Sequence, residues 1–413
     1  MGRKGTKVKL AVCIPNYNRP EKLYRLLKQL ADQIMEENLF GRVEICISDD
    51  KSPESPDDVV GEIRRLYPAI RIVYWVNEKN MGMDYNFLQS VMISEGEYCW
   101  IVGNDDEPEE KAFRTILDYI SDSSVDLLVC PFHIYNEDGK ALKTIDPMEN
   151  RENEVLYFHT KNPDEYGRLL RRAKDGNALF CFLSNVVFRR DDWIRHGDMF
   201  ADKMNTIFIQ MYMNLQTLKE GALYAYIPDS FIKNHGDAQV NETFKREYDV
   251  LVGLSGVVDY FFEGNLHDLL QERIVDSRIN GRMWALPDDS PLKRPILKVK
   301  SAKNDYYRKY FVRPECRKEY FAGKNVMVYG AGDLGHRALT ELSGYEVKSL
   351  SIYDSDVKKQ GKQMEGYRIG GPVQLKEKYN ESDGLIVPAN NLSLVEIIDR
   401  LLQVGMTDIA IIN

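Results

Sequence analysis

The sequence has few cysteines, no long apolar run and no excess of positive charge, and each of these absences excludes a class of protein. Its six cysteines include no Cys-x-x-Cys pair, so neither a zinc site nor a disulfide framework is expected. No apolar run approaches the roughly 20 residues that a membrane-spanning helix requires. The formal net charge of -9 argues against nucleic-acid binding, because proteins that follow a phosphate backbone need a basic surface.

No secretory signal is expected, since the first residues, Met-Gly-Arg-Lys-Gly-Thr, contain no apolar segment. Most of the cysteines lie inside apolar, strand-like runs, such as those around Cys13 and Cys46, and are expected to be buried thiols. Buried, unpaired thiols are typical of a reducing compartment. The sequence therefore predicts a cytoplasmic protein.

The composition that is present, 43% hydrophobic and 29% charged over 413 residues, is typical of a folded globular chain with two or three domains. Between residues 7 and 134, short apolar runs alternate with amphipathic segments. The expected strands are 8–14, 43–48, 70–76, 98–102 and 126–130. Such alternation predicts an α/β fold, with a mixed, mostly parallel sheet that has flanking helices and binds ligands beyond the carboxyl ends of its strands.

Three parts are expected along the chain. Residues 1–240 form the α/β domain just described, with its less regular part, 135–240, on the acceptor side. Residues 241–322 form a helical and basic linker region, and residues 323–413 a second, smaller Rossmann-like α/β domain.

Acidic pairs close two of the expected strands. Asp49-Asp50 follows one strand and Asp105-Asp106 another, with Asn80-Met81-Gly82 between them in the sequence. A single such pair is often only a turn or a helix cap. Two such pairs at one edge of the same sheet instead favour a ligand-binding site. The first could accept hydrogen bonds from a nucleobase or a ribose, and the second suits a hard cation such as Mg²⁺ or Mn²⁺.

These motifs resemble those of the family 2 glycosyltransferases, which have the GT-A fold. The resemblance is carried by Ile14-Pro15-Asn16-Tyr17-Asn18-Arg19, by Ser48-Asp49-Asp50-Lys51-Ser52, by Asn80-Met81-Gly82 with Asn86 and Glu95-Gly96-Glu97-Tyr98, and by Gly103-Asn104-Asp105-Asp106, where the family has Asp-x-Asp-Asp. It implies a metal-dependent, inverting enzyme that moves a sugar from a nucleotide-sugar donor to a hydroxyl of a glycan or lipid-linked acceptor. The chain resembles in particular the branch that builds bacterial surface polysaccharides.

The resemblance also assigns residues. Those expected to contact the nucleotide-sugar are Pro15, Tyr17, Asn18, Arg19, Asp49, Asp50, Asn80, Gly82, Asn104 and Asp105. Asp105 is expected to bind Mn²⁺ or Mg²⁺. His235 is a second metal candidate, because a late histidine often completes the metal ligands in GT-A enzymes; the alternative is an exposed loop histidine. His133 is a candidate for the acceptor cleft.

Two positions depart from the family pattern. Gly103 replaces the first Asp of the metal motif, so a ribose contact must come from Asn104 or elsewhere. The family's catalytic base falls on Gln210, counted back from Gly221, and an amide cannot act as a general base. Asp202 or Asp198, from the preceding loop, could replace it.

Two alternative functions stay open, a scaffold that these departures favour and an enzyme class that shares the general fold. The first is a catalytically impaired scaffold that binds a nucleotide-sugar. The second is a sugar nucleotidyltransferase, but that class needs a glycine-rich loop after the first strand, and the segment Pro15 to Pro20 contains no glycine.

A second nucleotide-binding pattern begins at Gly330. A strand-like run leads into Gly330-Ala331-Gly332-Asp333-Leu334-Gly335, a helical segment and a second strand that ends at Asp354. This layout is typical of a dinucleotide-binding half, and it makes Gly330, Gly332, Gly335 and Asp354 candidate nucleotide contacts. The remaining chain is too short for a full two-half site. A regulatory or assembly role, which would allow a homo-oligomer, is the alternative.

The segment 293–318 combines ten lysines and arginines with interleaved aromatic residues. One interpretation is a peripheral contact with the inner face of a membrane. The other is a solvated helix between domains.

Overall fold

The computed structural model describes residues 8–122, 124–136, 139–150, 153–235, 244–291, 293–299, 301–379, 383–390 and 393–413. The chain divides into two compact units, one formed by Met1–Thr243 with Gly256–Leu270 and the other by Phe244–Ser255 with Gln271–Asn413. Each unit contains its own hydrophobic core.

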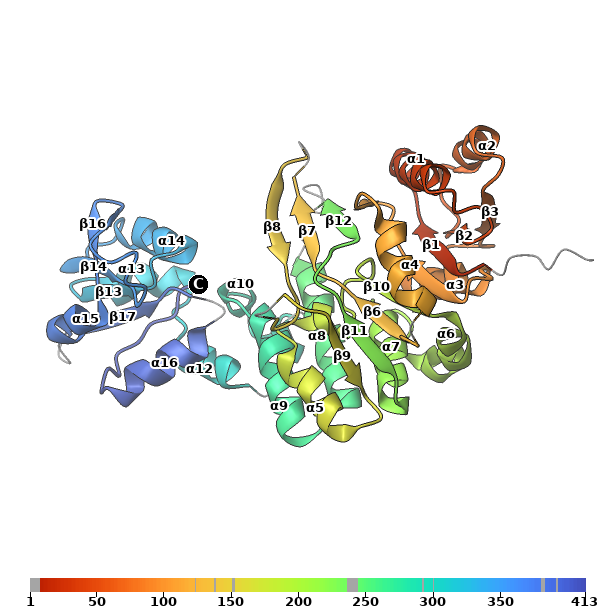
Figure 1. Ribbon diagram of the computed structural model, residues 1–413. Coiled ribbons are helices and arrows are strands. Elements are labelled where there is room, and N and C mark those ends of the chain that lie inside the picture. The colour runs from red at the N-terminus through yellow and green to blue at the C-terminus, as the bar shows by residue number, and fades with distance from the viewer. Residues whose placement is uncertain are drawn as a thin grey trace, which may run out of the picture. The chain divides into compact units, whose positions relative to one another are not determined.

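The first unit is built on an eight-stranded sheet of order β3-β2-β1-β4-β10-β6-β11-β9 (Figure 1). Its strands are β1 Leu10–Asn16, β2 Val43–Asp49, β3 Arg71–Val76, β4 Tyr98–Ile101, β6 Leu127–Val129, β9 Leu156–His159, β10 Val186–Arg189 and β11 Leu223–Tyr226. Strands β1 to β4 are parallel, whereas β10 is antiparallel to both β4 and β6. The predicted α/β class, with a mixed, mostly parallel sheet and flanking helices, is confirmed.

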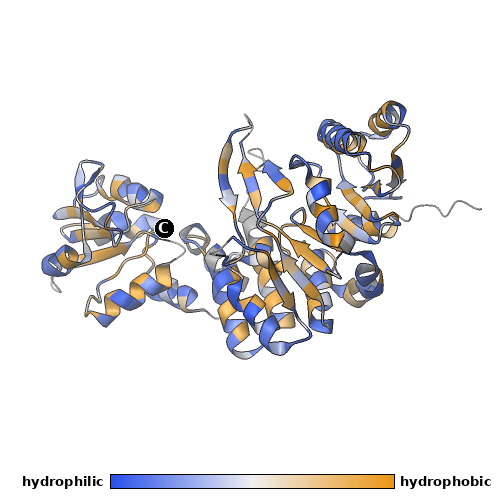
Figure 2. Ribbon diagram, in the orientation of Figure 1, coloured by the Kyte–Doolittle hydropathy of each residue, from blue (hydrophilic) through white to orange (hydrophobic). Residues whose placement is uncertain are grey.

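Helix α1 of this unit buries one apolar stripe, whereas α7 is buried on nearly all sides. In α1, Pro20 occupies the first turn, where its missing N–H costs nothing, and Leu23, Leu26, Leu27 and Leu30 face the core. Figure 2 shows the apolar strands in orange between helices with blue outer faces. The helices are α1 Pro20–Glu36, α2 Asp57–Leu66, α3 Met83–Met92, α4 Ala112–Asp122, α5 Pro163–Arg172, α6 Arg190–His196, α7 Ile209–Glu220 and α9 Gly264–Leu270, with 3-10 helices at Gly176–Leu179 and Gly197–Lys203.

A second, four-stranded sheet of order β5-β12-β7-β8 belongs to the same unit. Its strands are β5 Asp106–Pro108, β7 Phe132–Tyr135, β8 Ala141–Ile145 and β12 Ile232–His235. Because β5 begins at Asp106, the turn 103–106 connects the parallel strands of the large sheet with this small one. Asn234 of β12 pairs with Asp106 of β5, so residues far apart in the sequence meet at the acidic turn.

The second unit contains a five-stranded sheet of order β15-β16-β14-β13-β17. Its strands are β13 Asn325–Tyr329, β14 Ser349–Tyr353, β15 Gln363–Met364, β16 Tyr367–Gly370 and β17 Gly384–Pro388. All are parallel except β15. Its helices are α10 Gly281–Trp284, α11 Lys293–Ile296, α12 Ala302–Tyr310, α13 Arg317–Phe321, α14 Asp333–Leu342, α15 Pro372–Lys378 and α16 Leu394–Gln403, and α8 Phe244–Phe261 is divided between the units.

The basic segment 293–318 presents less positive charge than its sequence suggests. Lys293, Lys303 and Arg317 are buried, and each donates hydrogen bonds to backbone carbonyl oxygens of the second unit. These three cations stabilise the fold, so fewer remain for the expected membrane contact. Among the described residues, no helix has both the length and the apolar character needed to cross a bilayer.

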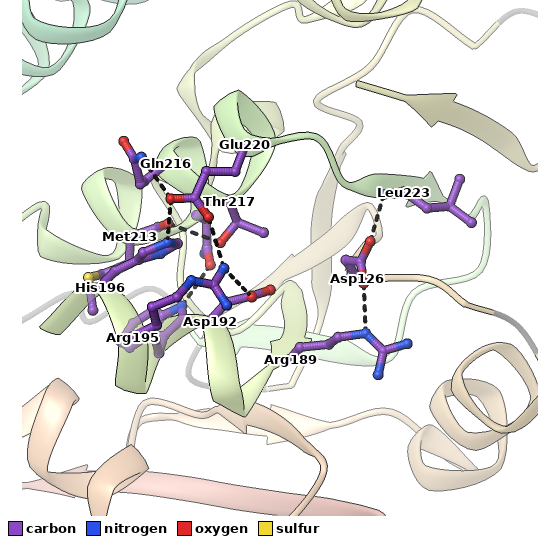
Figure 3. A network of polar contacts seen from close by, with 12 residues as sticks. Asp126, Arg189, Asp192, Arg195, His196, Met213, Gln216, Thr217, Glu220 and Leu223 are labelled. Carbon is purple, nitrogen blue, oxygen red and sulfur yellow. Dashed lines mark hydrogen bonds and ion pairs between the residues drawn. The ribbon is translucent and has the colours of Figure 1, made fainter. Parts of the chain in front are cut away.

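Helices α6 and α7 are joined by a network of ion pairs and hydrogen bonds (Figure 3). Glu220, the last residue of α7, accepts from Gln216 Nε2 at 3.0 Å and from Arg195 Nη2 at 2.9 Å, and it contacts His196 Nε2 at 3.0 Å. The hydrogen bond from Gln216, followed by those from His196 and Arg195, lowers the pKa of Glu220 to about 2. This network fixes the carboxyl end of α7.

Candidate active site

Side chains at the ends of three neighbouring parallel strands are joined by hydrogen bonds. Asn16, at the end of β1, donates from Nδ2 to Asp49 Oδ1 of β2 at 2.8 Å. Asn104, after β4, donates from Nδ2 to Asn16 Oδ1, also at 2.8 Å. Arg19 Nη1 lies 3.3 Å from Asn104 Oδ1 and 2.6 Å from Asp105 Oδ2. The expected convergence at the strand ends is therefore observed, with the buried Asn16 at its centre.

Asp49 organises the loop that follows β2. Its carboxylate is buried and accepts hydrogen bonds from Ser52 Oγ at 2.5 Å and from the Ser52 N–H at 2.9 Å. Ser52 Oγ in turn accepts from the N–H of Asn18, which has a φ of +52°. Tyr17 is 45% exposed beside this loop, and Pro15 is half-buried. The β1 and β2 loops therefore form one surface, with Tyr17 open to solvent.

Asp50 organises the turn that follows β3. It accepts from Asn77 Nδ2 at 2.9 Å and from the N–H groups of Met81 at 2.8 Å and Gly82 at 2.9 Å. Gly82 also donates to Asn80 Oδ1 at 3.1 Å, and its φ of +92° favours glycine. Both carboxylates of the Asp49-Asp50 pair thus hold protein loops, and a direct contact with a nucleobase or ribose stays a prediction.

The acidic turn is fixed by two residues that sequence reasoning did not select. Ser184 Oγ donates to Asp106 Oδ2 at 2.5 Å and accepts from the Gly103 N–H at 3.1 Å. Asn234 Nδ2 donates to Asp106 Oδ1 at 2.8 Å. Asp106 is only 3% exposed, and both of its oxygens are engaged. It is therefore a structural member of the turn.

Burial, together with the neighbouring charge of Asp105, raises the pKa of Asp106 from 3.8 to about 7. The folded state then binds this proton more tightly than the unfolded state. The contribution of Asp106 to stability is greatest below about pH 4 and is lost as the pH rises through about 7. We expect Asp106→Asn to lose less stability than the wild type between pH 5 and pH 8, measured by urea unfolding without divalent cations. Equal losses would contradict this assignment.

Removing the Ser184 hydroxyl should destabilise the turn. Ser184→Ala leaves Asp106 Oδ2 and the Gly103 N–H without their partner, at a cost of about 1–3 kcal/mol in unfolding free energy. Ser90→Ala is a matched control, because the hydroxyl of this buried serine donates to the carbonyl of Phe87 in its own helix. Urea denaturation of both variants makes the comparison, and equal losses would show that the turn does not depend on Ser184.

The absence of a side chain at position 103 has a steric cause. A Cβ on Gly103 would stand 2.9 Å from Asp106 Oδ2, closer than real Cβ contacts, and 3.0 Å from Asp105 Oδ1, tighter than most of them. The two carboxylates thus occupy the space that an aspartate at 103 would need. The departure from the family pattern is explained by the packing of this turn.

Asp105 is the carboxylate of the turn that remains accessible, since its side chain is 30% exposed and its ion pair is with Arg19, 39% exposed. Its Oδ1 and Asp106 Oδ2 face the same space beside Gly103. Within the described parts of the chain, no group of three or more His, Cys, Asp or Glu side chains is arranged to hold a metal. These residues fit a hard cation that takes most of its ligands from phosphate and water.

His235 lies at the end of β12 and has a carboxylate neighbour other than Asp105. Its Nε2 is 3.0 Å from Glu107 Oε2, without the alignment of a hydrogen bond, and its ring stacks on Tyr135 at 5.7 Å. His133 pairs through Nδ1 with Glu109 at 2.7 Å. A metal role for His235 and an acceptor role for His133 both stay predictions.

Gln210, at the position of the family's base, and Asp202, one of its two suggested replacements, lie in different surroundings. Gln210, in the first turn of α7, is 3% exposed and donates from Nε2 to the carbonyl of Cys181 at 3.1 Å. Asp202 is largely exposed and pairs with Lys203 at 2.7 Å, which lowers its pKa. A low pKa makes Asp202 a weak proton acceptor.

The glycine turn of the second unit is shaped by its own backbone. Gly330 has a φ of +121°, and a Cβ on Gly335 would lie 2.0 Å from the Gly330 carbonyl oxygen. Asp354 Oδ2 accepts from the Ala331 N–H at 2.7 Å and pairs with Lys359 at 3.1 Å. The glycines thus allow close packing of strand and helix, and Asp354 closes the turn. At Gly332, before α14, a Cβ would meet no other atom within 4 Å, so packing does not require glycine there.

Comparison with known proteins agrees with the class that this site indicates. Residues 11–197 match the model described as Glycosyl transferase family 2. The N-terminal part of the chain is thus similar to a family 2 glycosyltransferase domain, and the protein is a glycosyltransferase.

Particular relatives share this part of the chain. It is 29% identical over 239 residues to abequosyltransferase RfbV of Salmonella typhimurium, which covers 58% of this chain and 69% of that protein. It is 24% identical over 167 residues to the uncharacterized glycosyltransferase MJ1057 of Methanocaldococcus jannaschii, covering 40% of this chain and 56% of that protein. The crystal structure of S. aureus TarS 1–349 aligns with a TM-score of 0.47 and 14% identity, covering 76% of this chain and 78% of that one.

Proposed function

We propose that this protein is a metal-dependent, inverting glycosyltransferase that moves a sugar from a nucleotide-sugar donor to a hydroxyl of a glycan or lipid-linked acceptor in surface polysaccharide biosynthesis. The observation that carries the proposal is the hydrogen-bonded series Asp49–Asn16–Asn104–Arg19–Asp105 across three parallel strand ends. At one end the series provides polar groups for a nucleoside, and at the other it provides the Asp105 carboxylate beside the Arg19 guanidinium. The likeness to an abequosyltransferase supports the polysaccharide assignment.

The charges of the site suit a diphosphate leaving group. Asp105 would hold Mg²⁺ or Mn²⁺, with His235 as a second candidate ligand, and the bound cation would supply positive charge to neutralise the diphosphate leaving group. Arg19 is placed to share in that neutralisation, because its guanidinium lies directly against Asp105. The ribose contact that the family assigns to an aspartate would come from Asn104 or elsewhere, since Gly103 has no side chain and the Asn104 side chain already bonds Asn16 and Arg19.

The scaffold function is favoured by one observation, the amide of Gln210 where the family has its base. This amide offers no carboxylate in the first turn of α7, and its Nε2 already donates to the backbone carbonyl of Cys181. A scaffold would bind the nucleotide-sugar without turning it over.

The test is a panel of UDP-, GDP-, CDP- and dTDP-sugars with Mn²⁺ or Mg²⁺. The nucleotide that raises the thermal stability of the full chain identifies the donor class, because only ligands of the native state shift it. Transfer or slow hydrolysis of that donor is expected. Binding without either supports the scaffold, and pyrophosphate release from a triphosphate and a sugar phosphate would indicate a nucleotidyltransferase.

A nucleotide at Gly330, Gly332, Gly335 and Asp354 is a separate proposal for the second unit. It is supported by the order of strand, glycine turn, helix and acid, although Asp354 is already engaged by Ala331 and Lys359. Titration of an Asp105→Asn full-length chain with NAD and free nucleotides tests it, because this variant weakens the first site. No residual binding would leave regulation or assembly, including homo-oligomer formation, as the role of residues 323–413.

A cytoplasmic location is proposed with the same function. All six cysteines are free, and Cys13, Cys46, Cys99 and Cys130 are buried. The exposed part of the basic, aromatic segment 293–318 would then contact the inner face of a membrane. Co-sedimentation with anionic vesicles tests that contact.

A further inference from the structure

The segment that leads into α7 is held by a carboxylate from a different helix. Asp84, in the first turn of α3, is 2% exposed, and its Oδ2 accepts the N–H of Ile207 at 3.0 Å. Burial raises the pKa of Asp84, and the backbone N–H groups of Ile207, Ile209, Thr206 and Asn205 offset part of that rise. The first N–H groups of a helix lack partners within it, and a carboxylate placed there satisfies them.

The segment held in this way has an unfavourable backbone conformation. Asn205 has a φ of +70° and Ile207 a φ of +63°. The left-handed region is tolerated by asparagine but is rarely adopted by a β-branched residue such as isoleucine. Such a conformation persists only where surrounding contacts determine it, and these positions cluster at functional sites. The bond from Ile207 to Asp84 is one of those contacts.

The same segment touches the donor side of the site. Gly82 donates its N–H to Asp50, and a Cβ on Gly82 would lie 3.2 Å from Asn205 Oδ1. Asp84 follows two residues later, and Gln210 follows Ile207 by three. A short path of contacts thus leads from the Asp50 turn, through Asp84, to the first turn of α7.

We propose that Asp84 is a positioning residue that fixes the segment 204–208 and the first turn of α7 against the donor-binding turn. This rests on the proposed function, since the first turn of α7 is where the family places its base. Without the bond to Asp84, the strained segment relaxes, and the acceptor side of the site is displaced from the donor. The donor-binding loops themselves keep their own hydrogen bonds to Asp49 and Asp50.

The experiment compares Asp84→Ala and Asp84→Asn with the wild type. For Asp84→Ala we expect kcat to fall about 10- to 100-fold with the donor KM nearly unchanged, because misplacing a reacting group by about 1 Å has effects of this size. Asp84→Asn keeps an oxygen that can accept the Ile207 N–H, so it should recover most of kcat with an unaltered pH profile. Hydrogen exchange of residues 204–210 should accelerate in Asp84→Ala and much less in Asp84→Asn.

Glu220→Ala is the matched control, because it releases the opposite end of the same helix (Figure 3). It should lower thermal stability while leaving kcat unchanged. The proposal is overturned if Asp84→Ala keeps wild-type kcat despite faster exchange in 204–210. It is also overturned if Asp84→Asn is as inactive as Asp84→Ala, since Asp84 would then act through its charge, as a base does.

A wild-type chain that transfers no sugar would refute the proposed function and still leave the positioning role testable. In that case, faster exchange confined to 204–210 in Asp84→Ala, with unchanged nucleotide affinity, supports it. Exchange that accelerates throughout the first unit, as in a general loss of stability, contradicts it.

Discussion

Replacing Asp105 by asparagine is expected to reduce sugar transfer by about 100- to 1000-fold, the range found when one stabilising charge is removed from an active site. The fold should be little affected. Asp105 is 30% exposed and its ion pair is with a part-exposed arginine, and pairs of this kind contribute only about 0–1 kcal/mol. The test is the rate of sugar transfer from the donor that thermal shift identifies, measured with and without Mn²⁺.

Binding separates this result from a loss of structure. In the wild type, Mn²⁺ should strengthen the binding of the nucleoside diphosphate, and in Asp105→Asn this effect should vanish. Asp202→Asn is the control, since Asp202 is an exposed carboxylate whose ion pair is with its neighbour Lys203. Full metal-dependent activity of Asp105→Asn would show that Asp105 is not part of the metal site. An inactive Asp202→Asn enzyme would indicate that Asp202 is the catalytic base.

The second large effect is expected at Gly103, where restoring the family's aspartate should damage the enzyme. In Gly103→Ala the new Cβ would lie 2.9 Å from Asp106 Oδ2 and 3.0 Å from Asp105 Oδ1, so both carboxylates must move. We expect a loss of about 10- to 100-fold in kcat. Gly103→Asp adds a third carboxylate beside the buried Asp106, and its loss should be at least as large.

Gly61→Ala is the control for these glycine variants, because no atom lies within 4 Å of its Cβ position in α2. It should be fully active. The measurements are the kcat and the metal affinity of the two variants at position 103, each compared with the wild type. Activity of Gly103→Asp at or above the wild-type level would mean that the turn can rearrange around a third carboxylate.

The strands that carry the donor side of the site were predictable because each is a short apolar run that ends in polar residues. The runs 8–14, 43–48 and 98–102 correspond to β1, β2 and β4, and their parallel pairing follows from the helices between them. The antiparallel insertion of β10 between β4 and β6 was not predictable, because strand order depends on tertiary pairing.

The residues that hold the acidic turn and the segment before α7 could not be predicted from the sequence either, because they too depend on tertiary contacts. Ser184 and Asn234 are 78 and 128 residues from Asp106, and Asp84 is 123 residues from Ile207. A single serine or asparagine in a loop has no periodicity or motif that marks it. The burial of charged side chains was not predictable either. From the sequence, Lys293, Lys303 and Arg317 are expected at the surface, but in the structure they are buried hydrogen-bond donors.

The close approach of Asp106 to Gly103 has a consequence for variation among homologous chains. The N–H that Ser184 Oγ accepts belongs to the backbone, and every residue except proline provides it, so the serine does not by itself require glycine at position 103. The space beside Gly103 is instead limited by Asp106 Oδ2, which Ser184 and the burial of Asp106 hold in place. We therefore expect homologous chains with a buried carboxylate at position 106 to carry glycine at position 103.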